Sequence, residues 1–189
     1  HHVSGLSIYA RAYERSSKVI QMNSKWDPND FSQLLNKSHA TRCSLVPAQL
    51  YDLVTSGIKP PKTLKSLIIG GDQLDTPLHI QSLNMEWPVL RSYGMTEACS
   101  QIATERNTDN GIVPLNAWSL KIAKDNQILI KGKALFDGYI ELNNDIPMEK
   151  NITIDEDGFF HTGDFGELVN DKLIIFGRAD EQIKILGEK

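Results

Sequence analysis

The chain lacks the features that mark a membrane span, a disulfide framework or a nucleic-acid surface. No apolar run approaches the roughly 18 residues that a membrane-spanning helix needs. Only two cysteines occur, Cys43 and Cys99, and neither has a Cys or His partner at metal-ligand spacing. The 20 Lys and Arg residues are scattered and the net charge is −4, which disfavours binding to nucleic acid. These absences predict a cytoplasmic globular protein with reduced thiols, no membrane span and small-molecule partners.

The pattern of apolar residues changes near the middle of the 189-residue chain. From residue 1 to about 115, short apolar strands alternate with helical stretches, which predicts an α/β subdomain with a mostly parallel sheet flanked by helices. From 116 to 177, short alternating runs separated by turn residues predict a small β-barrel-like subdomain. The polar stretch 141–150 within it is predicted to be an exposed loop.

A strand predicted at residues 89–93 runs into a polar loop, and ligands collect at such carboxyl ends of parallel strands. The segment is Ser92-Tyr93-Gly94-Met95-Thr96-Glu97. The Glu97 carboxylate is a suitable oxygen ligand for Mg²⁺, and Thr96 can donate a hydroxyl hydrogen bond to a phosphate oxygen. Tyr93 offers a flat face on which adenine could stack. An ordinary strand-to-loop turn with a polar tip is the alternative.

A second candidate loop, Gly70-Gly71-Asp72, follows the apolar strand predicted at residues 67–69. Paired glycines permit positive φ and let a ligand lie against bare backbone. A plain tight turn is the alternative.

Two further segments carry an aspartate and an arginine that suit a ribose. Residues 158–164 are Gly-Phe-Phe-His-Thr-Gly-Asp, and residues 177–180 are Gly-Arg-Ala-Asp. Asp164 is expected on a β-turn, where its carboxylate can accept hydrogen bonds from both ribose hydroxyls, and Arg178 can donate to the same ribose. A surface ion pair between Asp164 and Arg178 is the alternative.

Taken in order, these segments resemble the motifs of the acyl-adenylate-forming enzymes. In that family ATP activates a carboxylic acid as an acyl-AMP, which a thiol such as that of coenzyme A then captures. The resemblance implies an ATP-dependent, AMP-forming acid–thiol ligase that binds ATP or AMP, Mg²⁺ and coenzyme A. It implies that Thr96 and Glu97 are catalytic and that Glu97 holds the metal. The residues implied to bind the nucleotide are Gly70, Gly71, Asp72, Ser92, Tyr93, Gly94, Met95, Thr96, Asp164 and Arg178.

The same resemblance implies how this chain relates to a whole enzyme. Asp180 corresponds to the hinge about which the family's C-terminal domain rotates, so residues 178–189 are expected to be the hinge and the start of that domain. Gly138 and Tyr139 are expected to fix a turn beneath the nucleotide. The family's upstream phosphate-binding loop and its downstream catalytic lysine are absent from these 189 residues. We therefore expect a central fragment that turns over no substrate alone, and a homo-oligomer of the full-length protein is compatible with these features.

The narrowest resemblance concerns the acid substrate. Residues 2–7, His-Val-Ser-Gly-Leu-Ser, and residues 100–104, Ser-Gln-Ile-Ala-Thr, resemble the o-succinylbenzoate–CoA ligases of menaquinone biosynthesis. The resemblance implies that His2 is catalytic and donates a hydrogen bond to the acid, whereas a capped helix start is the alternative. Residues 184–188 differ from that subgroup, so another acyl-CoA synthetase or a carrier-protein-loading adenylation domain stays open. A noncatalytic nucleotide-binding scaffold is the alternative of a different class.

Overall fold

The computed structural model describes residues 3–106, 111–143, 146–150 and 152–178, and it has the predicted α/β class. The helices are α1 (Val3–Glu14), α2 (Pro28–Ser38), α3 (Pro47–Thr55), α4 (Thr76–Asn84) and the 3₁₀ turn η1 (Thr96–Ala98). The strands are β1 (Arg42–Leu45), β2 (Ser66–Ile69), β3 (Val89–Met95), β4 (Ser100–Glu105), β5 (Ile112–Pro114), β6 (Trp118–Ile122), β7 (Gln127–Gly132), β8 (Tyr139–Asn143), β9 (Ile146–Lys150), β10 (Phe160–Val169) and β11 (Lys172–Arg178). None of the helices in these ranges is long and apolar enough to cross a membrane.

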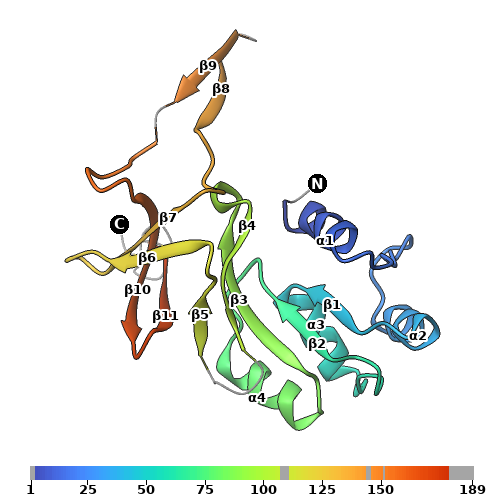
Figure 1. The fold of residues 1–189 in the computed structure, drawn as a ribbon. Coiled ribbons are helices and arrows are strands. Elements are labelled where there is room, and N and C mark those ends of the chain that lie inside the picture. The colour runs from blue at the N-terminus through green and yellow to red at the C-terminus, as the bar shows by residue number, and fades with distance from the viewer. Residues whose placement is uncertain (1–2, 107–110, 144–145, 151, 179–189) are drawn as a thin grey trace, which may run out of the picture.

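Three parallel strands and their connecting helices form one end of the sheet (Figure 1). α3 connects β1 to β2 and α4 connects β2 to β3, as parallel neighbours require. The apolar residues of α3 recur at helical spacing, so Leu50, Leu53 and Val54 all lie in the core. Trp87 fills the same core and satisfies its indole N–H by donating to the Ile58 carbonyl at 2.9 Å. This layer holds the ends of β2 and β3 in place.

Apart from β8 and β9, the described strands after β3 pair antiparallel and continue the same sheet. The strand order is β1-β2-β3-β4-β5-β11-β10-β7-β6. Only η1 joins β3 to β4, which is too short for a parallel crossover, so parallel pairing stops at β3 rather than extending through residue 115. A second apolar core lies under these strands and includes Tyr93, Ile102, Ile130 and Phe160. The division into subdomains near residue 115 stays a prediction.

The polar stretch 141–150 contains strands where a loop was predicted. β8 and β9 pair antiparallel as a separate two-stranded ribbon, which projects away from the rest of the molecule in Figure 1. Every residue of both strands is exposed, so the expected exposure is confirmed and the expected loop is wrong. A strand pair without a buried face needs no alternation of apolar and polar residues, and the sequence therefore carries no strand signal here.

Candidate active site

A cavity of about 800 Å³ lies where β2 and β3 end, against β5, β10 and β11. Of the predicted nucleotide-binding residues, those that line it are Gly71, Asp72, Ser92, Tyr93, Gly94, Met95, Thr96, Asp164 and Arg178, and the predicted metal ligand Glu97 lines it too. Gly70 is outside this lining, and an added Cβ there would meet the Ser92 hydroxyl at 2.7 Å. His2 and Asp180 lie outside the described residues. The fold thus brings together segments that are separated by more than 100 residues of sequence.

Asp164 and Arg178 lie opposite each other on two paired strands. Asp164 is part of β10, not of a β-turn, and its register partner on β11 is Arg178. Gly163 has a φ of +76° and lies where the pairing of β10 with β7 is irregular, between His161 and Phe165. The turn-forming residues therefore produce an irregularity within the strand and do not end it. Arg178 Nη1 lies 3.4 Å from Asp164 Oδ1, which is the ion pair considered from the sequence. Only Arg178 is substantially exposed, so the pair forms one wall of the cavity and not an ordinary surface bridge.

The Tyr93 side chain orients the Asp164 carboxylate. Its hydroxyl donates to Asp164 Oδ2 at 2.6 Å, and both residues are 7 % exposed. Burial and the neighbouring Asp164 carboxylate raise the pKa of Tyr93, so the hydroxyl stays a neutral donor at physiological pH. Asp164 N donates to Thr162 Oγ1, and the Thr162 hydroxyl donates to the Ile128 carbonyl. The predicted stacking of adenine on Tyr93 stays a prediction.

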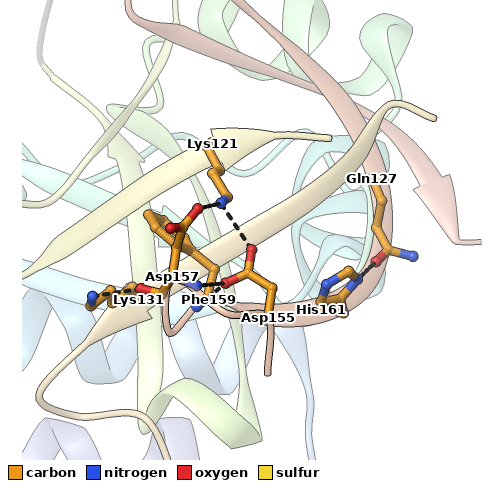
Figure 2. A network of polar contacts seen from close by, with 7 residues as sticks. All are labelled: Lys121, Gln127, Lys131, Asp155, Asp157, Phe159 and His161. Atoms are coloured by element: carbon orange, nitrogen blue, oxygen red, sulfur yellow. Dashed lines mark hydrogen bonds and ion pairs between the residues drawn. The ribbon is translucent and has the colours of Figure 1, made fainter. Parts of the chain in front are cut away.

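A polar network anchors the turn that leads into β10 (Figure 2). Lys121 Nζ contacts Asp155 at 2.8 Å and Asp157 at 3.0 Å, and it lies 4.2 Å from the centre of the Phe159 ring. Asp155 also accepts hydrogen bonds from the backbone N–H groups of Asp157 and Phe159. The hydrogen bond from Lys121 lowers the pKa of Asp155. The network fixes the start of the strand that carries Asp164 further along.

The Glu97 side chain is held by a residue 42 positions later in the sequence. Tyr139 Oη donates to Glu97 Oε1 at 2.7 Å, and the Phe136 N–H donates to the Glu97 carbonyl at 2.8 Å. The described residues contain no group of three or more His, Cys, Asp or Glu side chains that could hold a metal. A Mg²⁺ ion at Glu97 would therefore take most of its oxygen ligands from phosphate and water, which is how Mg²⁺ commonly binds with nucleotides. The single carboxylate fits that role.

The turn between β3 and β4 brings two backbones into close contact at Gly94. The register shifts between Tyr93 and Gly94, and Cys99 and Ser100 both have positive φ, at 52° and 104°. A Cβ added at Gly94 would overlap the Ser100 carbonyl. Bulges of this kind redirect side chains beside functional sites, and this one precedes Thr96 and Glu97.

Replacing Gly94 with alanine is expected to destabilise the protein and to disturb the cavity. The overlap with the Ser100 carbonyl forces one backbone to move, and we expect a loss of about 1–3 kcal/mol in the free energy of unfolding. Urea denaturation measures this loss. The matched control is Gly5→Ala in α1, where an added Cβ meets no atom within 4 Å. A Gly94→Ala variant as stable as the Gly5→Ala variant would contradict the proposed close contact.

An ion pair that the sequence did not reveal lies beside the cavity. Glu105 is 6 % exposed and accepts hydrogen bonds from Arg91 N at 2.8 Å and from Arg91 Nε at 2.9 Å. Burial alone would raise the pKa of Glu105, but the hydrogen bonds from Arg91 outweigh it and the pKa is lowered. Arg91 also lines the cavity. The pairing of β3 with β4 brings Arg91 and Glu105 together, and no local sequence motif predicts this ion pair.

An apolar wall is the other part of the cavity that sequence reasoning missed. Ile112 of β5 and Leu173, Ile174 and Ile175 of β11 line it. The alternating runs at residues 116–177 predicted strands in this part of the chain, but the partner of β11 could not be predicted. The neighbours β5 and β11 are some 60 residues apart in the chain, and only the strand order places them side by side.

Comparison with known proteins supports the resemblance seen in the motifs. No protein-family model matches the chain. The 2-succinylbenzoate–CoA ligase of Staphylococcus epidermidis is 32 % identical over 200 residues, covering 100 % of this chain and 41 % of the relative. The chain thus spans about two fifths of the length of such curated relatives.

Solved structures give the same result for the fold. MenE from E. coli, bound to an analogue of OSB-AMS, has a TM-score of 0.76 and 27 % identity, covering 95 % of this chain and 38 % of its own. The o-succinylbenzoate CoA synthetase of Bacillus subtilis in complex with ATP and magnesium has a TM-score of 0.78 and 25 % identity. The match covers 95 % of this chain and 40 % of the Bacillus chain. The same Bacillus enzyme has been solved with the acyl-adenylate intermediate OSB-AMP. That structure has a TM-score of 0.79 and 25 % identity to this chain, and the match covers 95 % of this chain and 39 % of the Bacillus chain.

In fold and in sequence the chain is similar to acyl-adenylate-forming enzymes, in agreement with the resemblance that the motifs predicted. The 2-succinylbenzoate–CoA ligases of Staphylococcus epidermidis and Staphylococcus aureus are among the proteins to which it is similar over its whole length. The match covers a part of those enzymes only.

Proposed function

We propose that this chain is part of an ATP-dependent carboxylic acid–CoA ligase that acts on o-succinylbenzoate. The observation that carries the proposal is the meeting of Glu97, Asp164 and Arg178 at one cavity, in a chain 32 % identical to a 2-succinylbenzoate–CoA ligase. Its ligands would be ATP, Mg²⁺, coenzyme A and the acid. The absence of nucleic-acid partners agrees with the net charge of −4. That absence and a cytoplasmic location stay predictions.

The reaction requires that an anionic acid approach an anionic nucleotide. The acid carboxylate attacks the α-phosphorus of ATP, the bond to the bridging oxygen breaks, and pyrophosphate leaves with its electron pair. Mg²⁺ would neutralise part of the phosphate charge, with Glu97 as one ligand. The CoA thiol then loses its proton and its sulfur attacks the acyl carbon. The bond from the acyl carbon to the phosphate oxygen breaks, and AMP leaves with that electron pair as the thioester forms.

The residues around the cavity would divide the work of binding the nucleotide. Asp164 would accept hydrogen bonds from the ribose hydroxyls, held in place by Tyr93, and Arg178 would donate to the same ribose. Thr96 would donate its hydroxyl hydrogen to a phosphate oxygen. The backbone of Gly71 and Asp72, together with Ser92, Gly94 and Met95, would form the surface against which the nucleotide lies. His2 would contact the acid, and Asp180 would serve as the hinge.

The test is ATP–pyrophosphate exchange by the full-length product of the gene that encodes this chain. The acids to compare are o-succinylbenzoate, benzoate, a fatty acid and an amino acid. Exchange driven by o-succinylbenzoate supports the whole proposal. Exchange driven by another acid keeps the chemistry and rejects the substrate, and an amino acid would favour a carrier-protein-loading enzyme. No exchange with any acid, together with retained AMP binding, would favour a noncatalytic nucleotide-binding scaffold.

The 189-residue chain by itself is expected to bind AMP-like ligands at best and to turn over no substrate. Isothermal titration with AMP and an assay for CoA thioester formation check the two halves of this prediction. Appreciable ATP- and CoA-dependent turnover by the purified chain would contradict it.

A further inference from the structure

The segment from Gly132 to Tyr139 braces the turn that carries Glu97. Two hydrogen bonds reach the same residue, one from the Phe136 N–H to the Glu97 carbonyl and one from the Tyr139 hydroxyl to Glu97 Oε1. The first fixes the main chain of Glu97 and the second fixes its carboxylate. A turn with a purely structural role would need only the hydrogen bond to the Glu97 main chain.

The Tyr139 ring is itself held by other aromatic rings. Phe136 packs edge-on against Tyr139, with ring centres 4.8 Å apart, and edge-on against Phe160, with ring centres 5.5 Å apart. Phe160 is 5 % exposed and belongs to the second core. The hydroxyl position therefore depends on the core rather than on the exposed ribbon that begins at Tyr139.

The Tyr139 hydroxyl is the donor of this contact and the Glu97 carboxylate is the acceptor. Donation to Oε1 leaves the other carboxylate oxygen of Glu97 available to a cation.

We propose that Tyr139 is a positioning residue that holds the Glu97 carboxylate in the orientation required by the Mg²⁺ that accompanies ATP. The inference rests on the proposed function, because it assumes that Glu97 serves the metal. Without the hydroxyl, Glu97 would have to be ordered by the ion itself. Ordering one long side chain weakens apparent metal affinity by about threefold to tenfold.

The test compares the full-length protein with its Tyr139→Phe variant, which keeps the ring and removes the hydrogen bond. The first measurement is the Mg²⁺ concentration that gives half-maximal pyrophosphate exchange, and the second is AMP affinity in the absence of divalent metal. We expect a rise of about threefold to tenfold in the first and no change in the second. An unchanged Mg²⁺ requirement, or an equal weakening of AMP binding, would overturn the proposal. Equal weakening would indicate a merely structural role.

Two further variants sharpen the test. Tyr51→Phe is the matched control, because Tyr51 is 57 % exposed on α3 and does not line the cavity, and it should change neither measurement. In a Glu97→Gln background, Tyr139→Phe should have no additional effect on the Mg²⁺ requirement. An undiminished effect in that background would show that Tyr139 does not act through Glu97.

A second readout separates this inference from the proposed function. Binding of Mn²⁺ in the presence of ATP can be followed by electron paramagnetic resonance without any turnover. If no acid supports exchange, the proposed function fails while Mn²⁺ binding still decides the role of Tyr139. A Tyr139→Phe variant that binds Mn²⁺ with ATP as tightly as the unaltered protein overturns the inference, and binding weakened threefold to tenfold supports it.

Discussion

Replacing Asp164 with alanine is expected to weaken AMP binding by a factor of roughly 30 to 700. Two ribose hydroxyls would each lose a hydrogen bond to a charged acceptor, which together contribute about 2–4 kcal/mol after the cost of desolvation. Tyr93 would also lose the acceptor of its buried hydroxyl, and Arg178 would lose its ion partner. Isothermal titration of the full-length protein with AMP measures the effect.

The control for Asp164→Ala is Glu167→Ala, which removes a carboxylate from an exposed position of the same strand. AMP affinity should be unchanged in that variant. Asp164→Asn provides a second test, because it keeps an acceptor for the Tyr93 hydroxyl while removing the charge. Both Asp164 variants should retain a cooperative thermal transition. Unaltered AMP affinity in a folded Asp164→Ala protein would show that this carboxylate does not bind the ribose.

Replacing Glu105 with alanine is expected to lower the free energy of unfolding by about 2–4 kcal/mol. Removing one partner of a buried ion pair leaves the other uncompensated, which costs about 3–5 kcal/mol in a fully buried site. The expected loss is smaller here because the Arg91 side chain is 34 % exposed and can regain water. The Arg91 backbone N–H loses its acceptor as well. Urea denaturation at neutral pH gives the value.

The matched control for Glu105→Ala is Glu141→Ala. Glu141 pairs with Lys150 at 2.7 Å, but both side chains are about 60 % exposed on the ribbon. Such an exposed pair contributes about 0–1 kcal/mol. A loss in Glu105→Ala no larger than that in Glu141→Ala would contradict the structural importance of the Arg91–Glu105 pair.

The same pair predicts the direction of a pH dependence. The pKa of Glu105 is lower in the folded protein than in the unfolded chain. Its contribution to stability is therefore fully present above the unfolded pKa, near 4.3, and is lost as the pH falls through the folded-state pKa. Acid denaturation of Glu105→Ala should lack this component, so the difference in stability between the two proteins should shrink as the pH is lowered below about 4.

The positions of the site residues could largely be predicted because they lie in short motifs, several of them at strand ends. The apolar residues before Gly70 and those before Ser92 each predict a strand. Parallel strands joined by a helix have their carboxyl ends at the same edge of the sheet, so the loops that follow them lie close together. Glu97, Asp164 and Arg178 carry the charge types that a nucleotide requires. Local sequence therefore predicted which residues face the cavity without predicting which of them touch.

The contacts that hold these residues could not be predicted, because they join distant strands. Tyr93 and Asp164 are 71 residues apart, and Glu97 and Tyr139 are 42 residues apart. Asp164 was expected on a turn because Thr-Gly-Asp has turn-forming residues, but pairing with β11 keeps it in a strand. The β8–β9 ribbon was expected to be a loop because both of its faces are exposed. Strands of that kind need no alternation of apolar and polar residues, so the sequence shows no strand pattern there.

By itself, the sequence determined the α/β class, the acyl-adenylate-forming resemblance and a set of candidate site residues, most of which line one cavity, because propensity, periodicity and short motifs are local properties. The tertiary structure alone decided that the antiparallel strands continue the parallel sheet, that Tyr93 and Tyr139 each orient a site carboxylate, and that Arg91 is neutralised by Glu105. Those contacts depend on which strands become neighbours, and strand partners are selected by the packing of the whole sheet, which no single segment encodes.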